Sequence, residues 1–113
     1  MDFRNTIPFR LDGLSLQTMA SGNLWMILSE SISWEEFPRY ATSILQFVGG
    51  SKVDVAESVE MRLWNVKILG QSMRLVYDDF PQMVSLESED AEGDLVLRGI
   101  HDRFVQSLKC NAS

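Results

Sequence analysis

The sequence predicts an α+β fold, in which an antiparallel sheet of about five strands carries two helices packed mainly on one face. Three observations lead to this prediction. Several short segments alternate apolar and polar residues with the period of a strand, two longer segments repeat apolar residues every three or four positions, and turn-forming residues separate them. The expected order along the chain is β-β-α-β-β-β-α.

The size of the chain fits one such unit. It has 113 residues, and neither a linker nor an internal repeat divides it, so we expect a single α+β domain over residues 1–113. Its hydrophobic content of 45%, with three Trp and six Phe, supplies enough apolar side chains for a core. This composition argues against a disordered chain.

The first two strands are expected to form a hairpin. Residues 14–19 alternate with period 2, the stretch ASGN follows as a turn, and residues 24–29 are apolar on both faces. A strand that is apolar on both faces is expected in the interior of the sheet.

The first helix has the clearest start signal. Ser33 at the N-cap and Glu36 three residues later form a capping box, while Pro38 predicts that regular hydrogen bonding begins late or with a slight bend. Gly49 and Gly50 end the helix, because glycine adopts the left-handed C-cap conformation without steric strain. The apolar stripe that faces the sheet consists of Trp34, Phe37, Ala41, Ile44, Leu45 and Val48.

Three strands are expected next. Residues 58–69 change the parity of their apolar positions near Leu63 and Trp64, which predicts either a β-bulge there or a strand buried on both faces. Gly70 and Gln71 fit a two-residue hairpin turn before the strand MRLVY. The stretch DDFPQ is the following turn, and MVSLES is the third of these strands.

The chain ends in a second expected helix. Acidic residues precede it and occupy its first turn, where the helix dipole favours negative charge. Gly93 and Gly99 each lower helix propensity by about 1 kcal/mol relative to alanine, so the sequence does not fix its first residue. One side of this helix carries Leu97, Ile100, His101, Phe104, Val105 and Leu108.

The overall charge narrows the class of partner. The formal net charge is −6 and the isoelectric point is about 4.6. Nucleic acids and anionic membranes bind clustered Lys and Arg, so neither is an expected partner, whereas a basic protein is. The simplest alternative is that the acidic residues serve solubility.

Cysteine usage and hydropathy indicate the compartment. Cys110 is the only cysteine, which rules out an internal disulfide and a cysteine-rich metal site. The N-terminal stretch MDFRNTIPFRLDG lacks a basic segment followed by a long apolar run, so no signal peptide is expected. The longest strictly apolar run, residues 24–28, is far shorter than the roughly 20 residues of a membrane helix. We expect a cytoplasmic protein.

One stretch, VYDDFPQMVSLESEDAEGD at residues 76–94, holds seven carboxylates and no Lys, Arg or His. The seven candidates for binding a basic partner are Asp78, Asp79, Glu87, Glu89, Asp90, Glu92 and Asp94. A calcium loop starting at Ser88 would place Gly99 at position 12, where a bidentate glutamate is needed, so no metal site is expected. The structural alternative is that these acids form turns and start the last helix.

Catalytic patterns are sparse in this sequence. It has no G-x-S-x-G, H-E-x-x-H or Walker motif, and VGGSK at residues 48–52 follows a helix instead of preceding one. Asp78 and Asp79 would point to opposite faces of a strand, so a turn role is favoured over a catalytic pair. His101, the sole histidine, is expected to be a partly buried structural imidazole. We therefore expect no enzyme, no catalytic residue and no cofactor.

The order of motifs from Ile32 to Glu87 resembles that of a known family. ISWEEFPRYATSIL provides a helix with an acidic-Phe-Pro start. LWNVKILGQSMRLVYDDF provides a tryptophan-bearing strand, a glycine turn and an L-x-Y-D strand, and VSLE completes the pattern. The whole resembles the DUF3630-like family of small bacterial proteins of unknown function, with Ser85 where that pattern has a tryptophan. The resemblance implies no activity and assigns no functional residues.

Three classes of function stay open. The leading hypothesis is a non-enzymatic protein-interaction module that uses the acidic segment, an exposed sheet edge, or both; a narrower version is an immunity- or antitoxin-like inhibitor of a basic toxin. A second class is a small enzyme or metal-binding protein that uses Asp78, Asp79 and Glu87, with His101 as an additional group. A third class is a homodimer assembled through the strand of Trp25 or that of Trp64.

Overall fold

The computed structural model describes the backbone of residues 7–111 and the side chains of residues 7–109. The expectations for residues 1–6 and for the Cys110 side chain lie outside the described residues. The helices are α1 (Phe37–Val48) and α2 (Ala91–Asn111). The strands are β1 (Ser15–Thr18), β2 (Leu24–Ser29), β3 (Ser51–Glu57), β4 (Met61–Ile68), β5 (Gln71–Asp79) and β6 (Gln82–Ser88).

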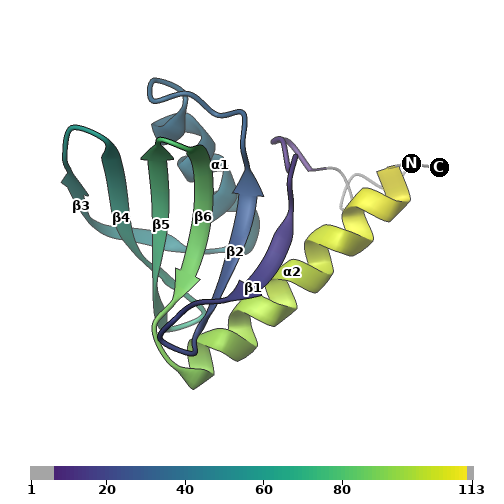
Figure 1. The fold of residues 1–113 in the computed structure, drawn as a ribbon. Coiled ribbons are helices and arrows are strands. Elements are labelled where there is room, and N and C mark those ends of the chain that lie inside the picture. Colours follow the sequence, from purple (N-terminus) through teal and green to yellow (C-terminus); the bar gives the residue numbers. More distant parts are fainter. Residues whose placement is uncertain (1–6, 112–113) are drawn as a thin grey trace.

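All these strands pair antiparallel in one sheet, in the spatial order β1-β2-β6-β5-β4-β3 (Figure 1). The predicted α+β class and antiparallel sheet are confirmed, but the strand count of about five was wrong because it misses β3. Every residue of β3 is exposed at the edge of the sheet. Its sequence does alternate, with Val53 and Val55 among charged residues, but the pattern is limited to these two valines and both are exposed.

The predicted Ser33–Glu36 contacts, late helix start and glycine end of the first helix are confirmed, but the N-cap of α1 is Glu36 and not Ser33. The Glu36 N–H donates to Ser33 Oγ at 3.2 Å, and the Ser33 N–H donates to Glu36 Oε1 at 3.0 Å, which completes the capping box. The regular helix then begins late, at Phe37, with Pro38 in its first turn. Gly49 ends α1 with φ of 73°, in the left-handed conformation expected of a C-cap glycine.

The turn between β4 and β5 lies one residue earlier than predicted. Ile68 pairs with Gln71, so the turn residues are Leu69 and Gly70, and both have positive φ, at 51° and 79°. Two positive φ values are typical of the type I′ turn, whose twist matches that of the flanking strands. The sequence misled the prediction because leucine is an unusual residue for the left-handed conformation.

Of the two alternatives for the change of parity near Leu63, a bulge or a strand with apolar residues on both faces, the bulge is excluded. β4 pairs with β5 without a shift in register; the shifts lie between Ile27 and Ser29 in β2 and within β3. Trp64 instead faces the core while Leu63 is half-buried on the other face. The change of apolar parity therefore marks a strand with apolar residues on both faces.

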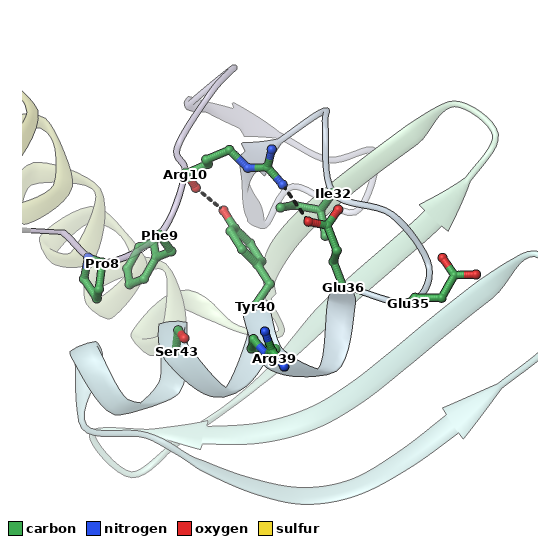
Figure 2. Close-up of a pocket in the computed structure, with 9 residues that line it drawn as sticks. All are labelled: Pro8, Phe9, Arg10, Ile32, Glu35, Glu36, Arg39, Tyr40 and Ser43. Atoms are coloured by element: carbon green, nitrogen blue, oxygen red, sulfur yellow. Dashed lines mark hydrogen bonds and ion pairs between the residues drawn. The ribbon is translucent and has the colours of Figure 1, made fainter.

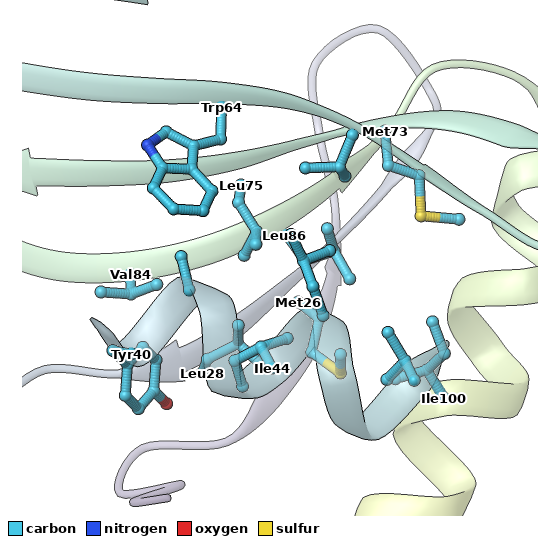
Figure 3. Close-up of a cluster of buried hydrophobic side chains, with 14 of the residues drawn as sticks. Met26, Leu28, Tyr40, Ile44, Trp64, Met73, Leu75, Val84, Leu86 and Ile100 are labelled. Atoms are coloured by element: carbon cyan, nitrogen blue, oxygen red, sulfur yellow. The ribbon is translucent and has the colours of Figure 1, made fainter. Parts of the chain in front are cut away.

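The two faces of the sheet have different surroundings. On the first face, Met26, Leu86, Leu75 and Trp64 follow one another across β2, β6, β5 and β4, and both helices join them in one hydrophobic core (Figure 3). The helix residues of this core are Phe37, Tyr40, Ala41, Ile44, Leu45 and Val48 of α1, and Leu97, Ile100 and Phe104 of α2. The alternate strand positions form what we call the second face: Trp25, Ile27, Leu63, Arg74, Val76, Asp78, Met83, Ser85 and Glu87.

Helix α2 extends diagonally from the β1 side of the sheet and contacts β2, β5 and β6 (Figure 1). Phe104 packs against Phe47 of α1, with ring centroids 5.8 Å apart, so the two helices share one layer. Of the predicted apolar side of α2, Leu97, Ile100 and Phe104 are buried, His101 and Val105 are half-buried, and Leu108 is exposed. Within residues 7–111 no helix is both long enough and apolar enough to cross a membrane.

Candidate interaction surface

The seven carboxylates between Val76 and Asp94 do not form one cluster. Strand β6 divides them, and its seven residues span about 20 Å at the usual rise per residue. Asp78 and Asp79 lie at one end of β6, Glu87 lies on its second face, and the remaining four lie around the start of α2. An acidic stretch that is continuous in sequence is therefore separated into three places.

The acids near α2 have structural partners. Asp90 caps the helix, because its Oδ1 accepts the Gly93 N–H at 2.7 Å. Asp94 Oδ1 accepts the Leu24 N–H at 2.9 Å, which joins the first turn of α2 to the start of β2. Asn23 donates to the Glu89 carbonyl at 3.2 Å. These contacts follow the structural alternative that the sequence left open, and among this group Glu92 is simply exposed.

The other three carboxylates are not brought together either. Asp79 accepts the Tyr77 hydroxyl at 2.9 Å on the first-face side, whereas Asp78 lies on the second face, where burial raises its pKa. Glu87 lies away from Asp78, because Asp78 pairs with Met83 and Glu87 is four residues further along β6. Among the residues that the structure describes, no group of three or more His, Cys, Asp or Glu is placed to hold a metal ion. His101 has Asp102 beside it on α2, at 3.4 Å.

Two exposed apolar side chains instead mark the end of the sheet near Asp78. Val59, in the β3–β4 turn, is 91% exposed, and Phe80, in the β5–β6 turn, is 92% exposed. The Asp79 N–H donates to the Glu60 carbonyl at 2.9 Å, so the two turns are joined. We call this end of the sheet, with Val59, Glu60, Met61, Asp78, Asp79 and Phe80, the hairpin tip.

Charge at the hairpin tip is mostly negative. Glu60, Asp78 and Asp79 belong to it, and Glu57 lies beside it at the end of β3. The neighbouring cation is Arg62, whose Nε is 2.5 Å from Glu57 Oε2 and whose guanidinium lies 4.7 Å from the centre of the Trp34 ring. Because Arg62 is held by these partners, it does not neutralise the remaining acids.

The exposed sheet edge is the other surface that the sequence suggested. Edge strand β3 exposes Val53 and Val55, but it also carries a register shift and the charged residues Lys52, Asp54 and Glu57. Bulges and charges are the features by which edge strands avoid pairing with another chain. Strands β2 and β4, which hold Trp25 and Trp64, are both interior strands, and Trp64 is buried in the core.

The second face brings Trp25, Glu87 and Arg74 into one cross-strand row. Trp25 pairs with Glu87 of β6, and Glu87 pairs with Arg74 of β5. Burial raises the pKa of Glu87, while Arg74 opposes this shift. Arg74 Nε lies 3.4 Å from Glu87 Oε1, and no hydrogen bond joins these two atoms. The result is a partly desolvated carboxylate beside an indole ring.

A shallow pocket of about 380 Å³ lies over this row. Its lining residues are Gln17, Thr18, Met19, Ala20, Trp25 and Glu87. No local sequence pattern predicts this pocket, because the contact between Trp25 and Glu87 depends on the pairing of β2 with β6, which are distant in the chain. The polar pair Ser85 and Glu87 on the second face of β6 was the one available signal.

A larger cavity of about 440 Å³ lies beside α1 (Figure 2). Three of its polar residues are joined: Arg10 binds Glu36 at 3.1 Å, and the Tyr40 hydroxyl donates to the Arg10 carbonyl. Burial raises the pKa of Tyr40, so its hydroxyl stays protonated at neutral pH. The contacts in this cavity serve to hold the N-terminal segment against α1.

The family comparison covers most of the chain that carries these surfaces. A family model described as protein of unknown function (DUF3630) matches residues 14–102. The chain belongs to the DUF3630 family. Both the hairpin tip and all residues that line the Trp25–Glu87 pocket lie within the DUF3630 match, whereas the Arg10 side of the larger cavity lies outside it. Neither the curated proteins nor the solved structures gave a match.

Proposed function

We propose that this DUF3630 protein is a non-enzymatic protein-interaction module that binds a basic protein through the hairpin tip. The observation that carries the proposal is the pair Val59 and Phe80, which are more than 90% exposed at the ends of two joined hairpins. Single exposed apolar residues are common on protein surfaces, but apolar side chains gathered within a polar rim are typical of binding sites.

The charges around the pair support a basic partner. Phe80 provides a large apolar surface of the kind that dominates interface energetics, and the acidic residues Glu60, Asp78 and Asp79 belong to the same end of the sheet. Complementary charge at the rim of an interface raises the association rate and disfavours acidic partners. A basic toxin, with this chain as its inhibitor, would be one partner of this kind.

The rigidity of the tip also favours binding. The Ser58 N–H donates to the Met61 carbonyl at 2.8 Å, which closes the β3–β4 turn, and the bond from Asp79 to Glu60 fixes this turn against its neighbour. A surface that is ordered before the partner arrives loses less conformational entropy on binding.

Quantitative co-purification from the native cell at low salt tests this proposal. The test compares the wild type with a tip variant, Val59→Ser/Phe80→Ser, and a control variant, Leu69→Ser/Leu95→Ser. Leu69 and Leu95 are 75% and 70% exposed but lie away from the tip, at the β4–β5 turn and on α2. We expect wild type and control to retain a basic protein at stoichiometric level and the tip variant to lose it by at least about tenfold, as for an interface hot spot.

Two results would overturn the proposal. One is equal recovery of the partner by wild type and tip variant; the other is the absence of any stoichiometric basic partner. Thermal unfolding of the variants shows whether a loss of partner binding comes from misfolding. Because both side chains at the tip are almost fully exposed, replacing them should leave the unfolding temperature nearly unchanged.

A further inference from the structure

The three tryptophans of the chain differ in what lies over their rings. Lys52 Nζ lies 4.7 Å from the centre of the Trp64 ring, and the Arg62 guanidinium lies at the same distance from the Trp34 ring. Within residues 7–109, no cation lies over the ring of Trp25. Trp25 is therefore the one tryptophan whose ring lacks such a contact in the described part of the chain.

The site around Trp34 shows how this fold holds a guanidinium. Arg62 stacks on Trp34, donates to the Trp34 carbonyl at 2.8 Å and approaches Glu57 to 2.5 Å. Trp25 and Glu87 repeat the combination of an indole and a glutamate on the second face, where paired residues of neighbouring strands place their Cβ atoms about 5 Å apart. Trp25 and Glu87 lack the cation that Arg62 provides at Trp34 and Glu57.

Arg74 does not take that place. It reaches Glu87 from the opposite side of the row, from β5, and its closest approach of 3.4 Å leaves the two side chains without a hydrogen bond. The pocket of about 380 Å³ lies on the other side of Glu87, toward Trp25 and the end of β1. The Glu87 carboxylate is therefore accessible to a second cation from the pocket side.

We propose that the Trp25–Glu87 pocket receives an arginine side chain of the basic protein partner. This inference rests on the proposed function, since it names one residue that such a partner presents. The guanidinium stacks on the Trp25 indole and donates to the Glu87 carboxylate, while Gln17 and Thr18 offer oxygen acceptors at the rim. Arginine fits better than lysine, because its planar group stacks on an indole and pairs with a carboxylate at the same time.

The placement of the pocket is compatible with simultaneous contact at the hairpin tip. Met83 lies at the tip end of β6 and Glu87 four residues further along the second face, a separation of about 13 Å. A standard protein interface of about 800 Å² per partner covers both places. The partner would then insert arginine at one end of its contact surface and meet Phe80 at the other.

Titration of the full ¹⁵N-labelled chain with N-acetyl-arginine methylamide tests the pocket, with the indole N–H resonance of Trp25 as the readout. The Trp25→Phe variant identifies this resonance. The citrulline analogue, which has nearly the same shape without the charge, is the matched ligand control. We expect a saturable shift with arginine, with a Kd on the order of 10 mM for so small a ligand, and no saturable shift with citrulline.

Variants separate the role of Glu87 from that of general negative charge. Glu87→Gln is expected to weaken arginine binding by at least about tenfold, whereas Glu89→Gln, an equal loss of charge at an exposed neighbour, should change it by less than about twofold. The resonances of Trp34 and Trp64 should not respond, because Arg62 and Lys52 already cover those rings. An equal response to citrulline, the absence of a saturable shift, or unchanged binding by Glu87→Gln would each overturn the inference.

The proposal for the pocket and the proposal for the hairpin tip can be refuted separately. If the tip variant loses the partner but arginine does not bind at Trp25, the proposed function stands and the arginine pocket is wrong. If arginine binds at Trp25 but the tip variant retains the partner, the pocket stands and the proposed role of the tip is wrong. Thermal unfolding of Glu87→Gln confirms that any lost binding does not come from lost structure.

Discussion

Asp79 donates its backbone N–H to the carbonyl of Glu60 at 2.9 Å, and this bond holds the β5–β6 turn against the β3–β4 turn. It places Phe80 and Val59, which are far apart in sequence, at the same end of the sheet. The hairpin tip is thus a property of the sheet register, since Met61 and Asp78 are the last paired residues of β4 and β5 before the two turns.

Asp90 should stabilise the fold, although it belongs to the acidic run. Asp90→Ala removes the side-chain acceptor of the Gly93 N–H, so we expect a loss of about 1 kcal/mol in the free energy of unfolding, as for other N-caps. Urea denaturation measures it. Glu92→Ala, at an exposed position of the same turn, is the control and should change stability by no more than about 0.5 kcal/mol. Equal effects of the two variants would contradict a capping role.

The two glycines of α2 should respond oppositely to alanine. A Cβ at Gly93 would lie 2.8 Å from Ser88 Oγ, and Ser88 is buried with its hydroxyl bonded to the Asp90 carbonyl, so Gly93→Ala should be destabilising. A Cβ at Gly99 meets nothing within 4 Å. Gly99→Ala should therefore raise the free energy of unfolding by about 1 kcal/mol. Thermal or urea unfolding compares them, and a gain in both variants would refute the close approach at Gly93.

Leu69 holds the left-handed conformation at a cost in stability. Its φ is 51°, and asparagine followed by glycine is the favoured sequence for such a turn. Because the Leu69 side chain is 75% exposed, Leu69→Asn should lose little apolar burial and gain about 0.5–1 kcal/mol. Leu95→Asn, at an equally exposed site on α2, should give no gain. Unfolding free energies of the two variants provide the check, and a destabilised Leu69→Asn would contradict the assignment of strain to this residue.

Glu87 should lower stability at neutral pH. Burial raises its pKa, so the folded protein holds this proton more tightly than the unfolded chain does. The unfavourable contribution is absent at low pH and develops as the pH rises from the ordinary pKa of glutamate through the raised value. Glu87→Gln should thus be more stable than the wild type at pH 7 and equally stable near pH 3, as measured by urea denaturation. A less stable Glu87→Gln at pH 7 would mean that the attraction to Arg74 outweighs the loss of hydration.

The sequence contained the local features of the fold. The capping-box contacts of Ser33 and Glu36, the glycine C-cap at Gly49 and the strands MRLVY and MVSLES are confirmed, because each depends on residues close together in the chain. Strand β3 was missed although Val53 and Val55 alternate with charged residues, because only these two valines mark it and neither is buried. The turn at Leu69 was misplaced because a leucine with positive φ contradicts the usual preference.

The candidate surfaces depend on contacts that no local pattern reveals. The run from Asp78 to Asp94 reads as one acidic segment, yet strand β6 separates its ends by about 20 Å. Trp25 and Glu87 meet only because β2 pairs with β6 across the intervening helix and strands. Phe80 and Val59 likewise reach the same end of the sheet through the meander of β3 to β6. Predicting these contacts requires the strand order and not merely the strands.

Hydrogen–deuterium exchange on the complex co-purified with the wild-type chain tests the central claim most directly. The proposed mode of binding predicts that partner contact slows amide exchange in residues 58–61 and 78–83, at the hairpin tip, relative to the free protein. The outer side of α2, around Leu95, should exchange at the same rate in both states. Protection confined to α2 or to the edge strand β3, with unchanged exchange at the tip, would contradict the account.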